Sequence, residues 1–253
     1  MATRAPADYP GCPETVCAAE AAGIPLISPR WGIPDALITI GLSVVLAVLA
    51  GVVALTLDLP LGIAVIAGIV TPWIGLLGWP LLATRLRGNG PRIDLGLRLT
   101  WSDVGLGAAV GLLGLVLAGV IALLTQGVVG DFNSAAGEIA VELQDEGTLA
   151  MFAFAVAAMV GAPIVEEITF RGMVFNSLRK RGLSAVWTIA VTALVFAAFH
   201  LEPVRFFILL PIGVLYGWLR WKTGALGAPI IAHMVNNGPA AVVLLLGLPE
   251  VTP

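Results

Sequence analysis

In this chain of 253 residues, 58% of the side chains are hydrophobic and only 11% are charged, whereas soluble domains carry roughly 25% charged residues. Together with a mean hydropathy of +0.99, this composition predicts an integral, polytopic membrane protein. The net charge of −3, without any basic stripe, argues against a nucleic-acid partner and makes the lipid bilayer the first expected partner.

The first 34 residues combine Pro, Ala and scattered charges, and they contain neither the hydrophobic core nor the cleavage site of a signal peptide. We therefore expect residues 1–34 to form a polar, disordered tail. Cys12 and Cys17 lie in this tail at a spacing that matches no zinc or redox motif, so we predict no role for them.

Seven apolar runs follow, and all but the longest are close to the roughly 20 residues that cross a hydrocarbon layer. They cover residues 36–57, 61–84, 104–126, 148–180, 183–201, 204–221 and 226–246. The pattern predicts an all-α bundle of about seven membrane-spanning helices. We divide it into N-terminal helices with their loops (residues 35–147), a C-terminal core (148–247) and a short tail (248–253).

Three features within these runs predict local structure. Gly107 and Gly111 have the G-x-x-x-G spacing that lets two helix backbones approach closely. Residues 127–147 are acidic and predict an exposed loop or surface helix. The run at 148–180 is too long for an untilted span, and Gly161 and Pro163 predict a kink within it.

The distribution of basic residues predicts the orientation of the bundle, because Lys and Arg concentrate in cytoplasmic connections. With the N-terminus inside, every Lys and Arg except Arg205 falls on or toward the cytoplasmic side, and the C-terminus lies outside. We also expect several tryptophans to act as anchors at the membrane interface, namely Trp31, Trp79, Trp101 and Trp221.

Two adjacent carboxylates, Glu166 and Glu167, stand in the apolar run at 148–180. An ionisable group at the centre of a membrane helix costs roughly 2.5 to 3.5 kcal/mol on insertion scales, so such groups usually mark function. Arg171 follows Glu167 at i+4 and predicts an ion pair within the helix. Glu166 points about 100° away from Glu167 and is left to face something else.

The only histidines, His200 and His233, both fall in apolar runs that predict helices. Phe196 precedes His200 by four residues and Asn237 follows His233 by four, so each pair shares a helix face. Counting ~1.5 Å per residue from the helix ends predicts that Glu166 and His200 lie at similar depths, about 21 and 24 Å. Asn237 comes out shallower at about 16 Å, and His233 fits least well at about 10 Å.

The three patterns Glu166-Glu167-x-x-x-Arg171, Phe196-x-x-x-His200 and His233-x-x-x-Asn237 resemble, in type and order, the three motifs of the CPBP family of intramembrane proteases. This family includes CAAX prenyl endopeptidases and proteins linked to bacteriocin processing or immunity. The resemblance covers roughly residues 150–240. It implies a catalytic core at 148–247, a location in the bacterial plasma membrane, and hydrolysis of membrane-associated peptides, prenylated or bacteriocin-type.

The chemistry of these residues agrees with that implication. Peptide hydrolysis needs a base for water, donors for the oxyanion and an acid for the leaving amine. Glu166 is the expected base and His200 positions the water, while His233 and Asn237 donate to the oxyanion. Glu167 and Arg171 support the first carboxylate, and Phe196 packs against His200.

The sequence leaves the use of a metal open. Glu166, His200 and His233 offer the carboxylate and imidazole ligands that zinc accepts. However, the chain has no H-E-x-x-H motif, and a metal-bound Glu166 would require another base. We slightly favour a metal-independent glutamate mechanism.

Two other functions stay in competition. A non-proteolytic binding or immunity scaffold could retain the same polar pocket, and it would bind a membrane partner without cleaving any peptide. A small transporter could use Glu166 and the histidines as a proton relay, but the two halves of the chain show no inverted repeat.

Overall fold

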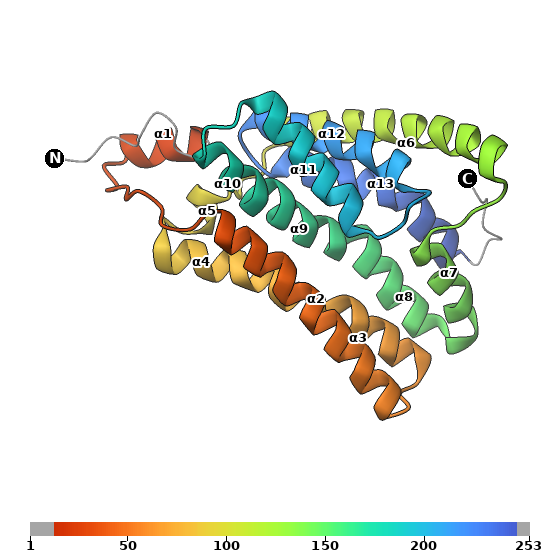
Figure 1. Cartoon of the computed structure of the whole chain (residues 1–253). Coiled ribbons are helices and arrows are strands. Elements are labelled where there is room, and N and C mark those ends of the chain that lie inside the picture. The colour runs from red at the N-terminus through yellow and green to blue at the C-terminus, as the bar shows by residue number, and fades with distance from the viewer. Residues whose placement is uncertain (1–12, 247–253) are drawn as a thin grey trace.

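The computed structural model describes residues 13–246, and within this range the chain forms helices without any strand. The predicted all-α bundle is therefore confirmed. Most of the long helices lie along a common direction (Figure 1), with the α2–α3 hairpin projecting from the rest of the bundle. Cys12 and the predicted C-terminal tail at 248–253 lie outside the described residues.

The helices differ in type as well as length. Most are α-helices, whereas η1, η3 and η4 are π-helical and η2 is a turn of 3-10 helix. In chain order the elements are α1 Pro13–Ala21, α2 Ile33–Thr56, α3 Leu61–Trp73, η1 Ile74–Gly78, α4 Trp79–Arg87, α5 Pro91–Asp94, α6 Trp101–Val129, α7 Ala135–Glu142, η2 Leu143–Glu146, α8 Thr148–Val156, η3 Ala157–Gly161, α9 Ala162–Glu167, η4 Ile168–Val174, α10 Phe175–Lys180, α11 Ala185–Phe199, α12 Phe206–Thr223 and α13 Gly227–Leu245.

Five helical segments of the described chain are long and apolar enough to cross a membrane, which confirms an integral membrane protein. They are Ile33–Thr56, Leu61–Arg87, Trp101–Val129, Thr148–Lys180 and Gly227–Leu245. The apolar helix α11 has 15 residues and a length of only about 22 Å, against roughly 30 Å for the hydrocarbon layer. The number of seven spans and the side of the N-terminus therefore stay predictions.

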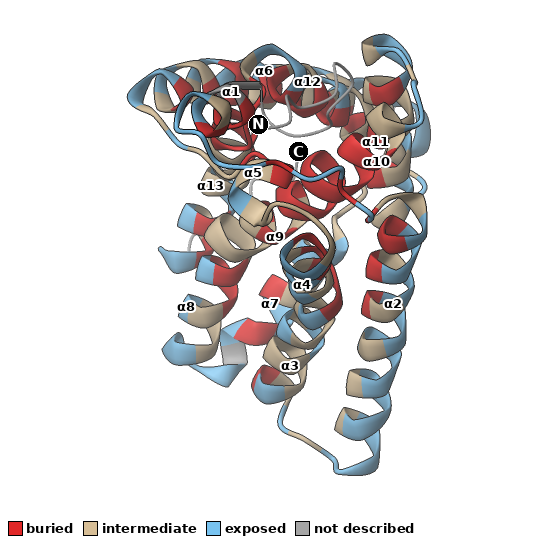
Figure 2. Ribbon diagram, turned by 90° about the vertical axis from the view of Figure 1, so that its left-hand side faces the viewer, coloured by how far each residue is buried: buried red, intermediate tan, exposed pale blue. Residues whose placement is uncertain are grey.

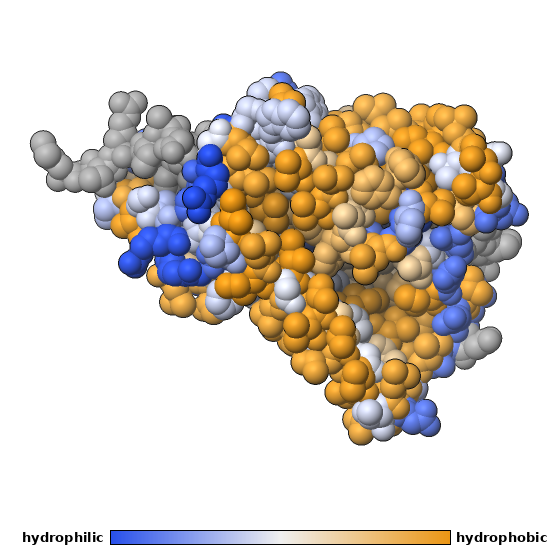
Figure 3. Space-filling model, viewed as in Figure 1, coloured by the Kyte–Doolittle hydropathy of each residue, from blue (hydrophilic) through white to orange (hydrophobic). Residues whose placement is uncertain are grey.

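The surface has the polarity of a protein that sits across a bilayer. Hydrophobic side chains cover the middle of the face seen in Figure 3, and hydrophilic residues gather at its two ends. In Figure 2 the far end of α2 is mostly exposed, and buried residues concentrate around α9 and α10. Because exposed apolar side chains such as Leu55 and Leu113 find a favourable solvent in lipid, this arrangement needs no further protein cover.

The N-terminal segment differs from the disordered tail that the sequence predicts. Residues 13–21 form α1, and the backbone N–H of Ile27 donates to Asn89 Oδ1 at 2.8 Å. Trp31 is only 1% exposed, and its indole N–H donates to Asp94 Oδ2 at 2.6 Å. The prediction of Trp31 as an interfacial anchor is wrong, because the buried carboxylate of Asp94 provides the partner that its indole needs. Trp101, 89% exposed, fits the prediction.

Arg220, which the sequence places among the cytoplasmic charges, lies inside the bundle instead. It is 2% exposed, and its Nε donates to the Arg171 carbonyl at 2.9 Å. Its Nη2 donates to Asn176 Oδ1 at 3.1 Å. Polar groups on neighbouring helices thus replace the water that a surface arginine would have.

The long segment Thr148–Lys180 is continuous, and its irregularities flank the two glutamates. The π-helix η3 ends at Gly161, two residues before Pro163, in the region where the sequence predicts a kink, and η4 directly follows Glu167. A π-turn changes the backbone pairing, and it is common at functional sites. Side chains from other helices bond carbonyls in both turns: Asn237 donates to Ala158, and Arg220 donates to Arg171.

The glycines of α6 make room for α13, as the G-x-x-x-G spacing predicts. A Cβ added at Gly107 would lie 2.5 Å from the Ala228 carbonyl oxygen, and one at Gly111 would lie 2.8 Å from the Ala232 carbonyl oxygen. Both distances are below any normal contact, so the two backbones can approach only where side chains are absent. This packing fixes how far α13, with its polar residues, is inserted along the bundle.

Replacing Gly111 by Ala should therefore lower the free energy of unfolding by about 1 to 3 kcal/mol, the usual cost of overpacking a tight contact. Gly119→Ala is the matched control, because this glycine of the same helix has no neighbouring atom within 4 Å of an added Cβ. The control should leave stability unchanged or raise it by up to about 1 kcal/mol. Thermal unfolding of both variants in detergent measures the difference, and equal effects would contradict close helix packing at Gly111.

Candidate active site

The buried foundation of the site is the ion pair that the sequence predicts within the long helix. Arg171 Nη1 donates to Glu167 Oε1 at 2.9 Å, and both side chains are fully buried. Arg171 Nη2 also donates to the Gly213 carbonyl at 3.0 Å. The guanidinium lies 4.4 Å from the ring centre of Phe196, a cation–π contact. The charge of Glu167 is thereby matched inside an apolar region, where water is scarce.

His233 joins this pair from α13. Its Nδ1 lies 3.0 Å from Glu167 Oε1, and its side chain is 6% exposed. A carboxylate only accepts hydrogen bonds, so Nδ1 carries the hydrogen and donates it. The contact leaves Nε2 free to point elsewhere, and Nε2 lies 3.9 Å from Glu166 Oε2.

The prediction that His233 fits the site least well is wrong. Counting residues from helix ends assumes that all helices begin at one level and run parallel. The glycines of α6 instead set the position of α13, which brings His233 to the level of Glu166 and Glu167.

His200 approaches from α11, although it stands at the end of this helix and not within it. It occupies the C-cap, and Leu201 after it has a positive φ of 55°, which ends the helix. His200 Nδ1 lies 2.9 Å from the Phe196 carbonyl oxygen, an acceptor, so Nδ1 is again the protonated nitrogen. The opposite nitrogen, Nε2, lies 3.9 Å from Glu166 Oε2.

Glu166 is the point where the two histidines meet. Its Oε2 is buried and has no hydrogen-bond partner among residues 13–246, while the side chain as a whole is 17% exposed. A separation of 3.9 Å to each imidazole is too long for a direct hydrogen bond and suits a bridging water. The structure thus gathers Glu166 Oε2 and the Nε2 atoms of His200 and His233 around a small volume that borders the surface.

Asn237 and Phe196 hold the surroundings of this volume. Asn237 lies one turn after His233, and its Nδ2 donates to the Ala158 carbonyl in η3 at 2.8 Å. One of its two N–H groups is thus engaged by backbone, and the other stays available for a ligand. The Phe196 ring contacts those of His200 and His233, with centroids 4.8 and 5.8 Å apart, as expected for a residue that packs against the imidazoles.

Tyr216 is the neighbour that the sequence does not single out. Its ring stacks on His233 with centroids 4.9 Å apart and an interplanar angle of 27°. It is 1% exposed and also lies beside the Arg171 guanidinium. The signal was available: the chain has two tyrosines, and Tyr216 is the one in an apolar run, where a phenol needs a polar neighbour.

Glu166, His200 and His233, the zinc ligands that the sequence suggests, lie close together. Their donor atoms are nevertheless farther apart than those of a typical zinc site. Zinc ligands stand about 2.0 to 2.2 Å from the metal, which puts donor atoms roughly 3.4 Å apart. Glu166 Oε2 lies 3.9 Å from each imidazole nitrogen. No group of three His, Cys, Asp or Glu side chains within the described part of the chain has metal-holding geometry. We therefore derive no catalytic step through a metal.

Comparisons with known proteins add an independent observation. Residues 148–238 match the family model described as "Type II CAAX prenyl endopeptidase Rce1-like". The chain is also 23% identical over 154 residues to "Putative membrane peptidase YdiL" of Bacillus subtilis (strain 168). That alignment covers 59% of this chain and 57% of the Bacillus protein. No solved structure matches the chain. The match spans all three motifs and supports the resemblance to the CPBP family.

Proposed function

We propose that the protein is an intramembrane endopeptidase, because residues 148–238 match the family model of Rce1-like type II CAAX prenyl endopeptidases. The observation that carries the proposal is the buried Glu166 Oε2, which has no hydrogen-bond partner among residues 13–246 and lies 3.9 Å from both histidines. An unpaired carboxylate oxygen is costly in an apolar bundle unless it serves a ligand. Water to be activated is the ligand that fits between this carboxylate and the imidazoles.

In the proposed reaction, a water molecule lies between Glu166 and His200 and donates its hydrogens to them. Both groups can only accept at these positions, because His200 Nδ1 carries the ring hydrogen and bonds the Phe196 carbonyl. The carboxylate takes one proton, and the oxygen attacks the carbonyl carbon of the scissile peptide. Glu166, now a carboxylic acid, returns the proton to the amine as the C–N bond breaks.

His233 is the proposed donor to the oxyanion. Glu166, Glu167 and Arg171 together carry one excess negative charge, and a proton on His233 balances it. Protonated His233 donates from Nδ1 to Glu167 and from Nε2 to the developing negative oxygen. The second N–H of Asn237 is a further donor, and Tyr216 holds the imidazole plane by stacking.

The proposed substrates are peptides held at the membrane. Prenylated C-terminal peptides are the first class to test, since the matching family is described by that activity. One hydrogen of the water passes through Glu166 to the new amine, and the remaining hydroxyl becomes part of the new carboxyl group. The atoms of the proposed hydrolysis therefore balance with water alone.

His200→Ala provides a test of this function. We expect kcat for cleavage of a membrane-tethered peptide in proteoliposomes to fall by about 10²- to 10³-fold, because the water loses one of its two acceptors. Glu202→Gln, in the connection directly after His200, is the matched control and should retain activity, because Glu202 pairs with Arg205 instead. Unchanged turnover in His200→Ala, or a wild type that binds peptides but cleaves none, would contradict the proposal and favour a binding scaffold.

A further inference from the structure

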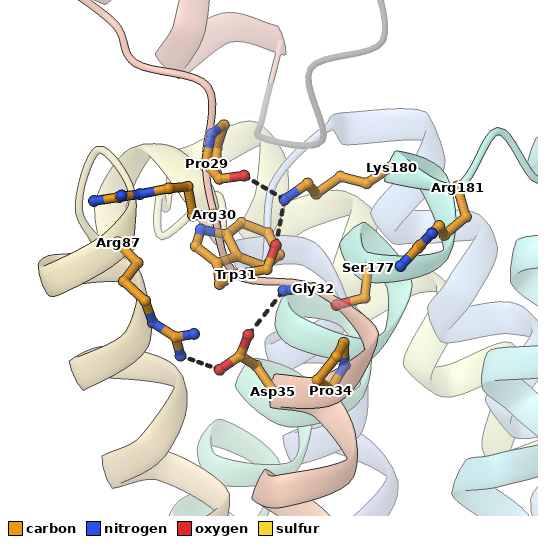
Figure 4. A pocket seen from close by; sticks show the side chains of 10 residues that line it. All are labelled: Pro29, Arg30, Trp31, Gly32, Pro34, Asp35, Arg87, Ser177, Lys180 and Arg181. Carbon is orange, nitrogen blue, oxygen red and sulfur yellow. Dashed lines mark hydrogen bonds and ion pairs between the residues drawn. The ribbon is translucent and has the colours of Figure 1, made fainter.

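A pocket far from the two glutamates lies where the N-terminal segment passes between α4 and α10 (Figure 4). Its volume is about 420 Å³. Lys180, which lines it, ends the helix that carries Glu166 and follows Glu166 by 14 residues, a rise of about 21 Å. The pocket is therefore separate from the candidate active site.

The lining of the pocket is strongly basic. In Figure 4, Arg30 and Arg87 lie on one side and Lys180 and Arg181 on the other. Asp35 is the carboxylate in this lining, and Asp94 is buried behind Trp31. Even counting both aspartates, cations exceed carboxylates by four to two. This excess stands out in a chain whose net charge is −3.

The cations differ in how far the protein itself uses them. Arg87 forms an ion pair with Asp35, and Lys180 donates to the Trp31 carbonyl and, at 2.6 Å, to the Pro29 carbonyl. These bonds fix the N-terminal segment against α4 and α10. The side chains of Arg30 and Arg181, by contrast, form no hydrogen bond or ion pair with any of residues 13–246. Two guanidinium groups are thus available to a ligand at a fixed opening.

The position of the pocket indicates which ligand it meets. Membrane-spanning segments begin at Ile33 and end at Arg87 and Lys180, so the pocket lies at the level where the apolar part of the bundle stops. One turn beyond Pro34, Leu37 and Ile38 of α2 are exposed and apolar. A molecule with an anionic head and fatty chains fits both surfaces, because basic pockets at a membrane boundary attract anionic headgroups.

We propose that this pocket, defined by Arg30, Arg87, Lys180 and Arg181, binds the phosphate headgroup of an anionic phospholipid. The guanidinium groups of Arg30 and Arg181 contact the phosphate oxygens, for which planar N–H donors are suited. The bound lipid holds the N-terminal segment against the ends of α4 and α10, since those elements supply the other walls of the pocket.

The test uses the delipidated full-length protein in detergent and a fluorescent phosphatidylglycerol as the probe. The double variant Arg30→Gln, Arg181→Gln should bind the probe about 30-fold more weakly than the wild type, because each cation near an anionic lipid contributes roughly fivefold. The matched control is Arg85→Gln, Lys222→Gln, which removes two exposed cations that do not line the pocket. The control should stay within about threefold of the wild type.

Competition and thermal unfolding complete the design. Unlabelled phosphatidylglycerol should displace the probe, whereas phosphatidylcholine and inorganic phosphate at the same concentration should not. Displacement by inorganic phosphate would assign the pocket to a free anion, and equal displacement by phosphatidylcholine would remove its charge selectivity; either result overturns the proposal. The same holds if both double variants weaken binding equally. None of the four replaced side chains bonds another described residue, so we expect both double variants to unfold near the wild-type temperature. That result shows that both variants are folded.

Discussion

Glu166→Gln should lower kcat for peptide cleavage by about 10³- to 10⁴-fold while leaving KM within about threefold, because only the transition state needs the lost base. The amide has the size of the carboxyl group but cannot take a proton from water. Folding should be unaffected, since Glu166 Oε2 has no hydrogen-bond partner in the described chain that the substitution would break. The measurement is single-turnover cleavage of a membrane-tethered peptide in proteoliposomes.

Glu138→Gln is the control for this experiment. Glu138 is an exposed carboxylate of α7, outside the candidate site, and its replacement should leave kcat unchanged. A Glu166→Gln protein that is folded and cleaves at the wild-type rate would remove the proposed base and, with it, the glutamate mechanism. Loss of activity in both variants would point to a general effect of charge on the bundle.

The second large effect concerns Arg171, which holds the buried end of the site together. Arg171→Leu should lower the free energy of unfolding by about 3 to 5 kcal/mol, the usual cost of leaving one member of a buried ion pair alone. The substitution leaves Glu167 uncompensated beside Glu166 and removes the donor to the Gly213 carbonyl. Thermal unfolding in detergent measures the loss, and Arg205→Leu is the control.

Arg205 also pairs with a nearby glutamate, Glu202, in the connection before α12, but Arg205 and Glu202 have side-chain exposures of 27% and 18%. Its loss should cost less than about 1 kcal/mol, because solvent screens the pair. The double variant Glu167→Gln, Arg171→Leu should recover part of the stability lost in Arg171→Leu, since no unpaired charge remains. If Arg171→Leu is as stable as the control, or if the double variant is less stable than Arg171→Leu, the ion pair does not stabilise the fold in the way described.

Contacts between residues close in sequence could be predicted well. The pair Glu167 and Arg171 forms as its i,i+4 spacing indicates, and the π-helical turn η3 ends at Gly161, one of the two residues at which the sequence predicts an irregularity. The separation of Glu166 from Glu167 also follows from helix geometry alone. Such features depend on one helix only, so the local order of residues contains the information that determines them.

Contacts between helices were harder to predict, and the wrong predictions all concern residues whose partners lie on another segment of the chain. His233 meets Glu167 across 66 residues, and Arg220 meets Arg171 across 49. The depth of His233 depends on how closely α13 approaches α6, and the burial of Trp31 depends on Asp94 across 63 residues. Residue counts within one helix contain no information about these distances.

Hydrophobicity and i,i+4 periodicity are properties of a single segment, so the sequence alone predicted an all-α membrane protein with three residue pairs at helical spacing. The packing of the helices determines that His200 caps α11, that His233 bonds Glu167 and faces Glu166, and that Arg30 and Arg181 border one basic pocket. These outcomes depend on side-chain packing between helices, where the glycines of α6 and the π-turns beside Glu166 and Glu167 set the relative positions.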